Sequence, residues 1–195
     1  MCKRTDPIYQ SIRDRHYVAN HSCVGQQIHY LIYLGDAPIG IISGASAVYA
    51  VEARDQFFGL NKDNKVGLNS IIDNVVFRLE YREPNLGTQI LSLWRKTIAV
   101  DWEAKYHVVV HGFETFVVEE KFRKGAMYKA DNWIYLGETA GSSKAHIGEN
   151  SGLGESKYSR IPTIKKLIFG KKIPGTELCK EYKSSWRTER KLLIH

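Results

Sequence analysis

The sequence is poor in cysteine and contains no long apolar run. Its three cysteines, Cys2, Cys23 and Cys179, are odd in number and lie far apart. They form no Cys-x-x-Cys pair, which argues against a disulfide framework and against a zinc ribbon. No stretch approaches the roughly 18 apolar residues of a membrane span, and the first residues lead into no secretory segment. We therefore expect a cytoplasmic protein without membrane contacts.

The sequence also has fewer acidic than basic side chains. The chain has 21 aspartates and glutamates against 28 lysines and arginines, and its formal charge is +7. From residue 157 onwards there are eleven basic side chains and three acidic ones, so residues 1–156 are nearly neutral. A basic C-terminal segment with interspersed aromatic side chains favours contacts with phosphates and stacking on bases. A solvated tail that keeps the protein in solution would explain the same charge.

What the chain does contain is a strand, a helix and a second strand in succession. The sequence predicts a strand over 74–81, a polar turn over 82–88, an amphipathic helix over 87–105 and a strand over 107–118. Such a unit places its two strands in parallel and leaves the helix N-terminus at their carboxyl ends. Ligands bind at that position in α/β proteins.

Further helices and strands are predicted around this unit. The expected helices cover 5–20, 45–60, 63–72 and 122–133, and the expected strands cover 27–34, 39–44, 134–139 and 165–170. This order predicts a mixed, partly parallel β-sheet flanked by helices, which is an α/β fold. We expect the core over residues 1–140, a Gly/Ser-rich mobile loop over 141–156, and a basic C-terminal segment with the last strand over 157–195.

The polar turn is suited to holding an anion. Free backbone N–H groups and the positive end of the helix dipole would point into it. The pattern Arg82-x-x-Asn85-x-Gly87 resembles the Arg/Gln-x-x-Gly-x-Gly/Ala loop with which GNAT acyltransferases hold the pyrophosphate of coenzyme A, with asparagine at one glycine position. The alternative is a Pro-Asn turn in which Asn85 or Thr88 only caps the helix.

Several spaced motifs together resemble a known family. They are His16-Tyr17, Ala53-Arg54-Asp55-x-Phe57-x-Gly59, Pro84-Asn85-Leu86-Gly87-Thr88, Glu114-Thr115-Phe116-Val117 and Tyr128-x-Ala130-x-Asn132-Trp133. In this order they resemble the DruA-like domain of the Druantia anti-phage system, which also occurs beside transposases. The Mom DNA-modification proteins of Mu-like phages resemble the same set of motifs in a shorter and more diverged form. The resemblance covers about residues 12–140 and implies a GNAT-like fold.

The resemblance to Mom also implies a chemistry, namely modification of the exocyclic N6 of adenine in DNA. The amine would attack an activated donor, such as acetyl-CoA or another acyl donor. Arg82 and the backbone amides of Leu86, Gly87 and Thr88 would anchor this donor, with Asn85 shaping the turn. Such a reaction also needs a group that manages the amine proton and a hydrogen-bond donor to the developing oxyanion.

Candidates for these roles lie in the other motifs. His16 would accept the proton, because a neutral imidazole is competent near neutral pH. Tyr128 or Asn132 would orient the donor or the base. Each residue also has a structural alternative: His16 caps its helix, Tyr128 belongs to the core, and Asn132 caps a helix C-terminus. An aspartate often follows the Glu-Thr-Phe-Val strand in the family, whereas this chain has Val118. If that aspartate is functional, either Glu119 replaces it through a bulge, or this chain has lost the chemistry and is a binding module.

A metal site is the remaining candidate in the N-terminal part. His16, His21, Cys23 and His29 lie within fourteen residues, but their spacing fits no zinc finger or ribbon. We therefore expect no metal, and Cys23 is more simply explained as a buried side chain.

Three classes of function follow. We favour a DNA-base-modifying transferase of Mom type that acts on double-stranded DNA. The alternatives are a non-catalytic nucleic-acid-binding component of an anti-phage or transposition system, with defence-system or phage proteins as partners, and an ordinary CoA-dependent N-acetyltransferase. A flipped-out base would need an aromatic stacking partner, and the phosphates would need cations. The expected nucleic-acid contacts are Trp133, Tyr135, Lys165, Lys166, Lys171 and Lys172.

Overall fold

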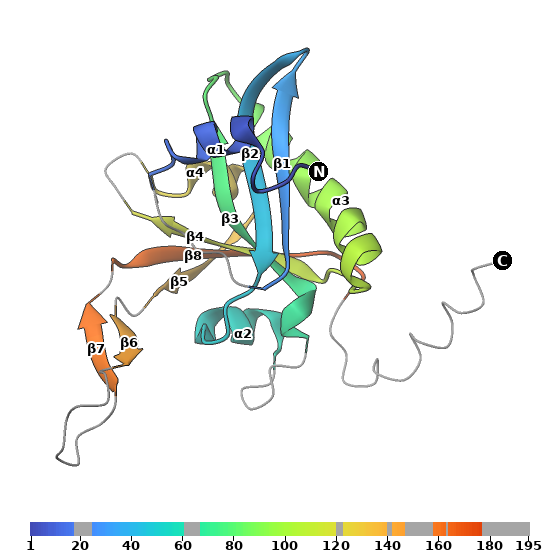
Figure 1. Cartoon of the computed structure of the whole chain (residues 1–195). Helices are drawn as coiled ribbons and strands as arrows, with labels where there is room; N and C mark the ends of the chain where they lie inside the picture. Colours follow the sequence, from blue (N-terminus) through green and yellow to red (C-terminus); the bar gives the residue numbers. More distant parts are fainter. Residues whose placement is uncertain are drawn as a thin grey trace.

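The computed structural model describes residues 1–17, 25–60, 67–119, 123–139, 142–146, 158–162 and 164–176. In these residues the chain forms a six-stranded sheet with helices on both faces and a separate two-stranded ribbon (Figure 1). The elements in chain order are α1 (Pro7–Arg13), β1 (Gln27–Leu34), β2 (Ala37–Ser46), α2 (Glu52–Phe58), the 3₁₀ turn η1 (Leu68–Ser70), β3 (Ile71–Leu79), α3 (Leu86–Tyr106), β4 (Gly112–Val118), α4 (Ala126–Ala130), β5 (Ile134–Glu138), β6 (Ser142–His146), β7 (Tyr158–Pro162) and β8 (Lys166–Lys172).

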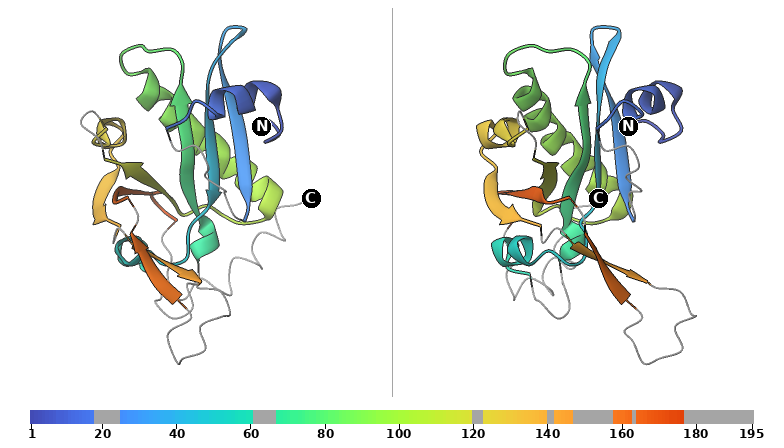
Figure 2. Two further views of the ribbon diagram at one scale, coloured as in Figure 1. Left: turned by 60° about the vertical axis from the view of Figure 1, so that its left-hand side comes forward. Right: turned by 90° about the vertical axis from the view of Figure 1, so that its left-hand side faces the viewer.

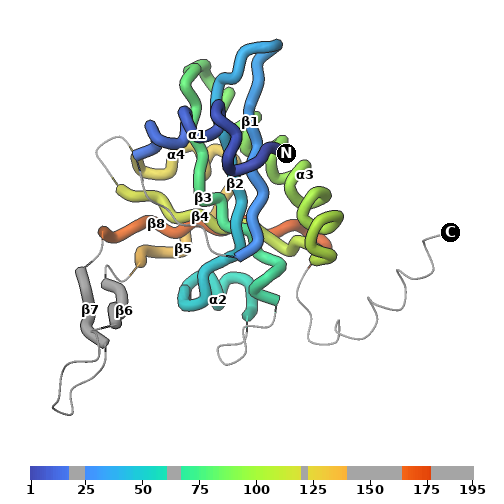
Figure 3. Tube along the Cα trace, in the orientation of Figure 1, coloured from blue at the N-terminus to red at the C-terminus, as the bar shows by residue number. Residues whose placement is uncertain are grey.

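The six strands form a mixed sheet in the order β1-β2-β3-β4-β8-β5. The pair β3 and β4 is parallel and is connected by α3, whereas the other neighbouring strands are antiparallel. The predicted mixed, partly parallel sheet flanked by helices is therefore confirmed. The last strand of this sheet in the sequence, β8, lies between β4 and β5 (Figure 3). It belongs to the core, although the sequence assigned it to a separate basic segment.

Helices α1 and α3 cover opposite faces of the sheet (Figure 2). The apolar residues of α3 recur every three or four positions, which gives one buried stripe that includes Trp94, Ile98 and Trp102. These side chains share a core cluster with Ile42 of β2, whereas the neighbouring Ile41 packs with α1. This division follows from the alternation of side chains along a strand.

Glycine at position 44 allows α3 to approach the sheet closely. A Cβ atom there would overlap Ile98 and would lie 2.7 Å from Ile72 Cγ2, so Gly44 removes the side chain that would hold the helix away. The result is a dense contact between α3 and the middle of the sheet.

Several predicted elements differ from the observed ones. The expected helix over 122–133 is only α4, because it starts after Gly125 with φ 69° and stops before Asn132 with φ 58°. The expected helix over 63–72 is replaced in its described part by η1 and the start of β3. Its isoleucines at 71 and 72 join the sheet, as β-branched side chains favour.

Another difference lies in the Gly/Ser-rich segment. Ser142–His146 forms β6, paired with β7, where the sequence predicted a loop, and the rest of 141–156 lies outside the described residues. Residues 177–195 of the basic segment lie outside them too. The strand expected over 107–118 begins only at Gly112.

Across the described ranges, no helix is both long enough and apolar enough to cross a membrane.

Candidate functional site

The parallel strands β3 and β4 separate soon after they pair. They are partners only at Ile71–Gly112, Ile72–Phe113 and Asp73–Glu114, and Figure 1 shows them running at a wide angle. A bulge helps to bend β3 at this point. Gly44 pairs with Asn74 and Ser43 pairs with Val76, so Val75 is the extra residue that increases the local twist.

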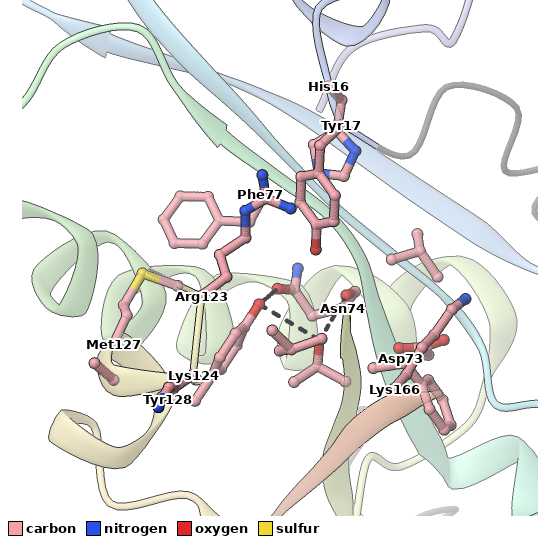
Figure 4. Close-up of a pocket in the computed structure, with 16 residues that line it drawn as sticks. His16, Tyr17, Asp73, Asn74, Phe77, Arg123, Lys124, Met127, Tyr128 and Lys166 are labelled. Carbon is pink, nitrogen blue, oxygen red and sulfur yellow. Dashed lines mark hydrogen bonds between the residues drawn. The ribbon is translucent and has the colours of Figure 1, made fainter. Parts of the chain in front are cut away.

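A cavity of about 350 Å³ lies in the opening between the two strands (Figure 4). Asp73 and Asn74 both line it although consecutive side chains of a strand point to opposite faces. The cavity therefore passes between the strands instead of lying on one face of the sheet. Its volume falls within the range of small-molecule sites, roughly 300 to 1,000 Å³.

A set of hydrogen bonds holds the cavity wall around Asn74. Its amide group donates to Ser43 O at 3.1 Å and to Val76 O at 3.3 Å, and so spans the bulge. The Tyr128 hydroxyl donates to Asn74 Oδ1 at 2.7 Å, and the Thr115 hydroxyl donates to Asn74 O at 3.0 Å. Burial raises the pKa of Tyr128 above its ordinary value, so the phenol stays neutral. Its proton is committed to Asn74, and we therefore expect Tyr128 to position other groups and not to act as a base.

Asp73 is the acidic group of the cavity. The residue is 4% exposed, and its Oδ1 has no hydrogen-bond partner among the described residues. Burial raises the pKa of Asp73 well above its ordinary range, and the neighbouring carboxyl of Glu114 adds to this effect, while Lys166 and Arg54 oppose it. Asp73 is therefore a carboxyl next to an open volume, and its burial favours the protonated form.

Glu114 belongs to a buried ion-pair network behind the cavity. Arg54 of α2 is completely buried, and its Nη1 donates to Glu114 Oε1 at 2.7 Å. Its Nε donates to Asp55 at 2.7 Å, and its Nη2 donates to the carbonyl of Val48. Burial raises the pKa of Glu114 to about 7 even though Arg54 opposes the shift. The Ala-Arg-Asp motif of α2 thus connects this helix to β4.

Neither Asp73 nor Glu114 was among the predicted site residues, although Glu114 begins the Glu-Thr-Phe-Val motif. The signal that would have found them is a charged side chain inside a strand of apolar residues, as in Ile71-Ile72-Asp73 and Phe113-Glu114. Buried carboxyls are rare unless they are paired, so such a position indicates either an ion-pair network or a functional group.

Aromatic rings and cations surround the opening of the cavity. The guanidinium of Arg123 lies 3.7 Å from the centre of the Tyr17 ring, and the rings of His16 and Tyr17 are 4.5 Å apart. Figure 4 shows the hydroxyls of Tyr17 and Tyr128 pointing toward the centre from opposite sides. Lys124 and Lys166 also line the cavity. A planar, negatively charged ligand would therefore find both ring contacts and positive charge here.

The N-terminus of α3 adjoins this cavity. Asn85 precedes the helix with φ 62° and makes no capping bond through its side chain with the described residues. The carbonyl of Asn85 accepts instead from the Thr88 hydroxyl at 2.8 Å. A Cβ on Gly87 would lie 2.8 Å from the sulfur of Met127, which lines the cavity. Met127 is thus the residue that connects the predicted anion turn to the cavity.

Residues 2–174 match the family described as Druantia protein DruA, which is most of the chain. The chain belongs to the DruA family. The resemblance inferred from its spaced motifs is thereby confirmed. No curated protein matches this DruA-family chain.

Among solved structures, similar ones are acetyltransferases. The aminoglycoside acetyltransferase AAC(6')-Ib in complex with coenzyme A has 11% identity and a TM-score of 0.48, with 87% of this chain and 72% of that chain covered. An acetyltransferase of the GNAT family from Streptococcus pneumoniae has 17% identity and a TM-score of 0.42, with 75% and 67% covered. The sheet order and the parallel pair that separates around α3 carry the fold assignment by themselves, and they agree with the predicted GNAT-like arrangement.

The structure brings part of the predicted site of the DruA-family chain together. His16, Tyr128 and Lys166 line one cavity, and the turn over 82–88 adjoins it. Arg82 and Asn85 are exposed, and Leu86, Gly87 and Thr88 are half-buried at the start of α3.

Asn132 and Trp133 lie at the end of α4, outside the cavity lining. The N–H of Asn132 donates to Lys129 O at 3.0 Å and the N–H of Trp133 to Tyr128 O at 2.9 Å, which is a Schellman motif. Asn132 therefore takes the left-handed position that ends the helix. Trp133 is 3% exposed within the core, and its indole donates to Asp131 at 2.8 Å. Tyr135 is half-exposed on β5 and contacts Phe169.

Glu119 and three of the four lysines lie outside the cavity lining. β4 pairs with β8 residue by residue from Gly112–Lys172 to Val118–Lys166, and Glu119 is exposed beyond this pairing. Lys165 lies 3.9 Å from Glu138, Lys171 contacts Asp131, and Lys172 lies over the ring of Phe57.

The weak metal candidates are only partly described. His21 and Cys23 lie outside the described residues. His29 Nδ1 lies 3.1 Å from the Tyr9 hydroxyl and 2.9 Å from the Ser43 hydroxyl, and burial, with help from nearby cations, lowers the pKa of His29 to about 4. Within the ranges that the structure covers, no three histidine, cysteine, aspartate or glutamate side chains could hold a metal together.

Proposed function

We propose that this DruA-family chain transfers an acyl or related group from an activated donor to an exocyclic amine of a DNA base, with adenine N6 favoured. The observation that carries this proposal is the cavity between β3 and β4. It contains the buried carboxyl of Asp73, whose Oδ1 has no hydrogen-bond partner among the described residues, and it adjoins the anion turn at α3 through Met127. One end of the site thus suits a phosphate-bearing donor, and the other suits an amine that must lose a proton.

The donor would lie along the N-terminus of α3. Its pyrophosphate would contact Arg82 and the backbone amides of residues 86–88, where the helix dipole favours negative charge. Its acyl end would pass beside Met127 into the cavity, because Met127 lines the cavity and packs closely against Gly87 at the start of α3. A thioester of coenzyme A has this shape and charge, and acetyl-CoA is the simplest example.

The acceptor would enter from the side of Tyr17 and Arg123. The cations Arg123, Lys124 and Lys166 line the cavity and would contact backbone phosphates of double-stranded DNA. A base inside a duplex is not accessible to such a cavity, so the base would have to flip out and stack on an aromatic ring. Tyr17, which is 43% exposed at the opening, is better placed for this stacking than the buried Trp133.

The test is nucleoside mass spectrometry of DNA from cells that express the chain. The parent should yield a mass-shifted adenosine or cytidine, and an Arg82→Ala, His16→Ala double variant should not. Lys96→Ala, which removes an exposed cation farther along α3, is the matched control and should keep the modification. An unmodified profile from folded parent protein would contradict the proposal.

The second candidate is a nucleic-acid-binding component without catalysis. The cations around the cavity favour it, because they would hold DNA whether or not a donor binds. Steeply salt-dependent DNA binding together with an unmodified nucleoside profile would support it. Coenzyme A binding without affinity for DNA would instead indicate an ordinary N-acetyltransferase.

A further inference from the structure

Two buried carboxyls face each other on the only parallel strand pair of the described sheet. Asp73 of β3 and Glu114 of β4 are register partners, so their side chains project from the same face of the sheet. Each carries one buried oxygen without a hydrogen-bond partner among the described residues, Asp73 Oδ1 and Glu114 Oε2. Of the two, only Asp73 lines the cavity. Adjacent carboxyls with unpartnered oxygens are the arrangement expected when two acids share a proton.

We propose that Asp73 is the catalytic residue that accepts the proton of the attacking amine, and that it passes its own proton to Glu114. Glu114 acts through Asp73 and is the positioning residue of this relay. The inference rests on the proposed group transfer and identifies how its proton is handled.

The group transfer begins when the amine nitrogen attacks the acyl carbon of the donor and an N–C bond forms. The N–H proton moves to Asp73 while the proton of Asp73 moves to Glu114. The bond between the acyl carbon and the leaving group breaks, and its electron pair stays on the leaving group, which is a thiolate for a thioester. The proton then returns through Asp73 to that thiolate, so both carboxyls recover their starting state.

The surroundings of the pair suit this transfer. Arg54 and Asp55 of α2, Lys166 of β8 and the two carboxyls themselves are the charged groups that act on it. Arg54 holds Glu114 Oε1 at 2.7 Å and leaves Oε2 available. Because burial raises the pKa of Glu114 to about 7, this carboxylate can take up and release a proton near neutral pH. In the relay Asp73 is protonated at rest, which its burial favours, and it supplies both a donor and an acceptor atom to the cavity.

The relay predicts two infrared bands of protonated carboxyls in the free protein, and these can be measured without an activity assay. Isotope-difference infrared spectroscopy should show the C=O band of a protonated carboxyl at about pH 8 in the parent, and Asp73→Asn should remove it. A second band should appear as the pH falls through about 7, and Glu114→Gln should remove that one. Asp36→Asn, which changes an exposed acid in the turn between β1 and β2, is the control and should change neither band.

The relay also predicts a kinetic result. Asp73→Asn should slow modification by about 10²- to 10⁴-fold, the usual contribution of general acid–base catalysis, while donor and DNA affinities change less than about threefold. The parent rate should rise with pH up to about 7 and then level off, and Glu114→Gln should remove this rise. Since Glu114→Gln also weakens the Arg54 network, Glu114→Asp is the second variant and should keep the pH dependence.

Two outcomes would overturn the relay. One is the absence of a protonated carboxyl band at about pH 8, and the other is an Asp73→Asn variant with the parent rate, which would assign the proton to His16. A parent with both infrared signals but without modified nucleosides would support the proton pair and contradict only the proposed DNA modification. Failure of the relay and failure of the proposed function can thus be distinguished.

Discussion

Replacing Asp73 with asparagine should stabilise the fold at neutral pH more than in acid. Burial raises the pKa of Asp73 well above its ordinary value, so the folded state holds a proton that the unfolded chain releases. The stability from this group is complete below its ordinary pKa of about 4, and it is lost as the pH rises toward the folded pKa. Each pH unit in this window lowers the free energy of unfolding by about 1.4 kcal/mol.

Asparagine does not titrate, so the variant does not lose free energy of unfolding in this way as the pH rises. Between about pH 5 and about pH 7 the variant should gain up to about 3 kcal/mol relative to the parent. The new amide also brings two hydrogen-bond donors into a buried site, at a cost of about 1 to 3 kcal/mol if they stay unpaired. That cost does not depend on pH, so it cancels when the two pH values are compared.

Urea unfolding of the parent, Asp73→Asn and the exposed-site control Asp36→Asn at both pH values measures this effect. The difference in free energy of unfolding between Asp73→Asn and the parent should increase with pH. The difference between Asp36→Asn and the parent should be the same at both pH values. A difference that is constant within about 0.5 kcal/mol would refute the reasoning. Asp73 would then be ionised in the folded protein, and it could not supply the resting proton of the relay.

Three further changes test other parts of the fold. Asn132→Ala should cost about 1 to 2 kcal/mol in thermal unfolding because φ is 58° there, whereas Asn132→Gly should be nearly neutral; equal effects would contradict the helix-ending role. Trp102→Ala should cost about 3 to 5 kcal/mol in urea unfolding, since its side chain is completely buried, and a cost under about 1 kcal/mol would argue against that burial. Gly87→Val should press on Met127 and weaken acetyl-CoA binding at least about tenfold in a titration, with the exposed Gln89→Ala as control; unchanged binding would place the donor elsewhere.

The strand–helix–strand unit around α3 was predictable because it depends on patterns between near neighbours in the sequence. The apolar residues of α3 repeat at the helical period, and the predicted helix over 87–105 agrees closely with Leu86–Tyr106. The strand predicted over 27–34 coincides with β1. The turn that begins α3 is recognisable because Asn85 and Gly87 are residue types with special backbone freedom. The spaced motifs likewise identified the DruA family before the fold was known.

The composition of the site was less predictable. Asn132 and Tyr128 are both in the Tyr-x-Ala-x-Asn motif, yet one ends a helix and the other lines the cavity. A motif records that residues occur together, and it does not say which of them a backbone conformation requires. The four lysines of β8 and its flank were grouped by charge, but strand alternation and pairing place only Lys166 at the cavity.

The sequence by itself determined the α/β class, the strand–helix–strand unit and the family, because each depends on patterns between near neighbours in the chain. The tertiary structure decided that β8 enters the sheet beside β4, and that Asp73 and Glu114 meet at the wall of an open cavity. These features arise from pairing between residues about forty or more positions apart. Whether a carboxyl keeps its proton depends on the burial that such pairing creates, and no local pattern contains that information.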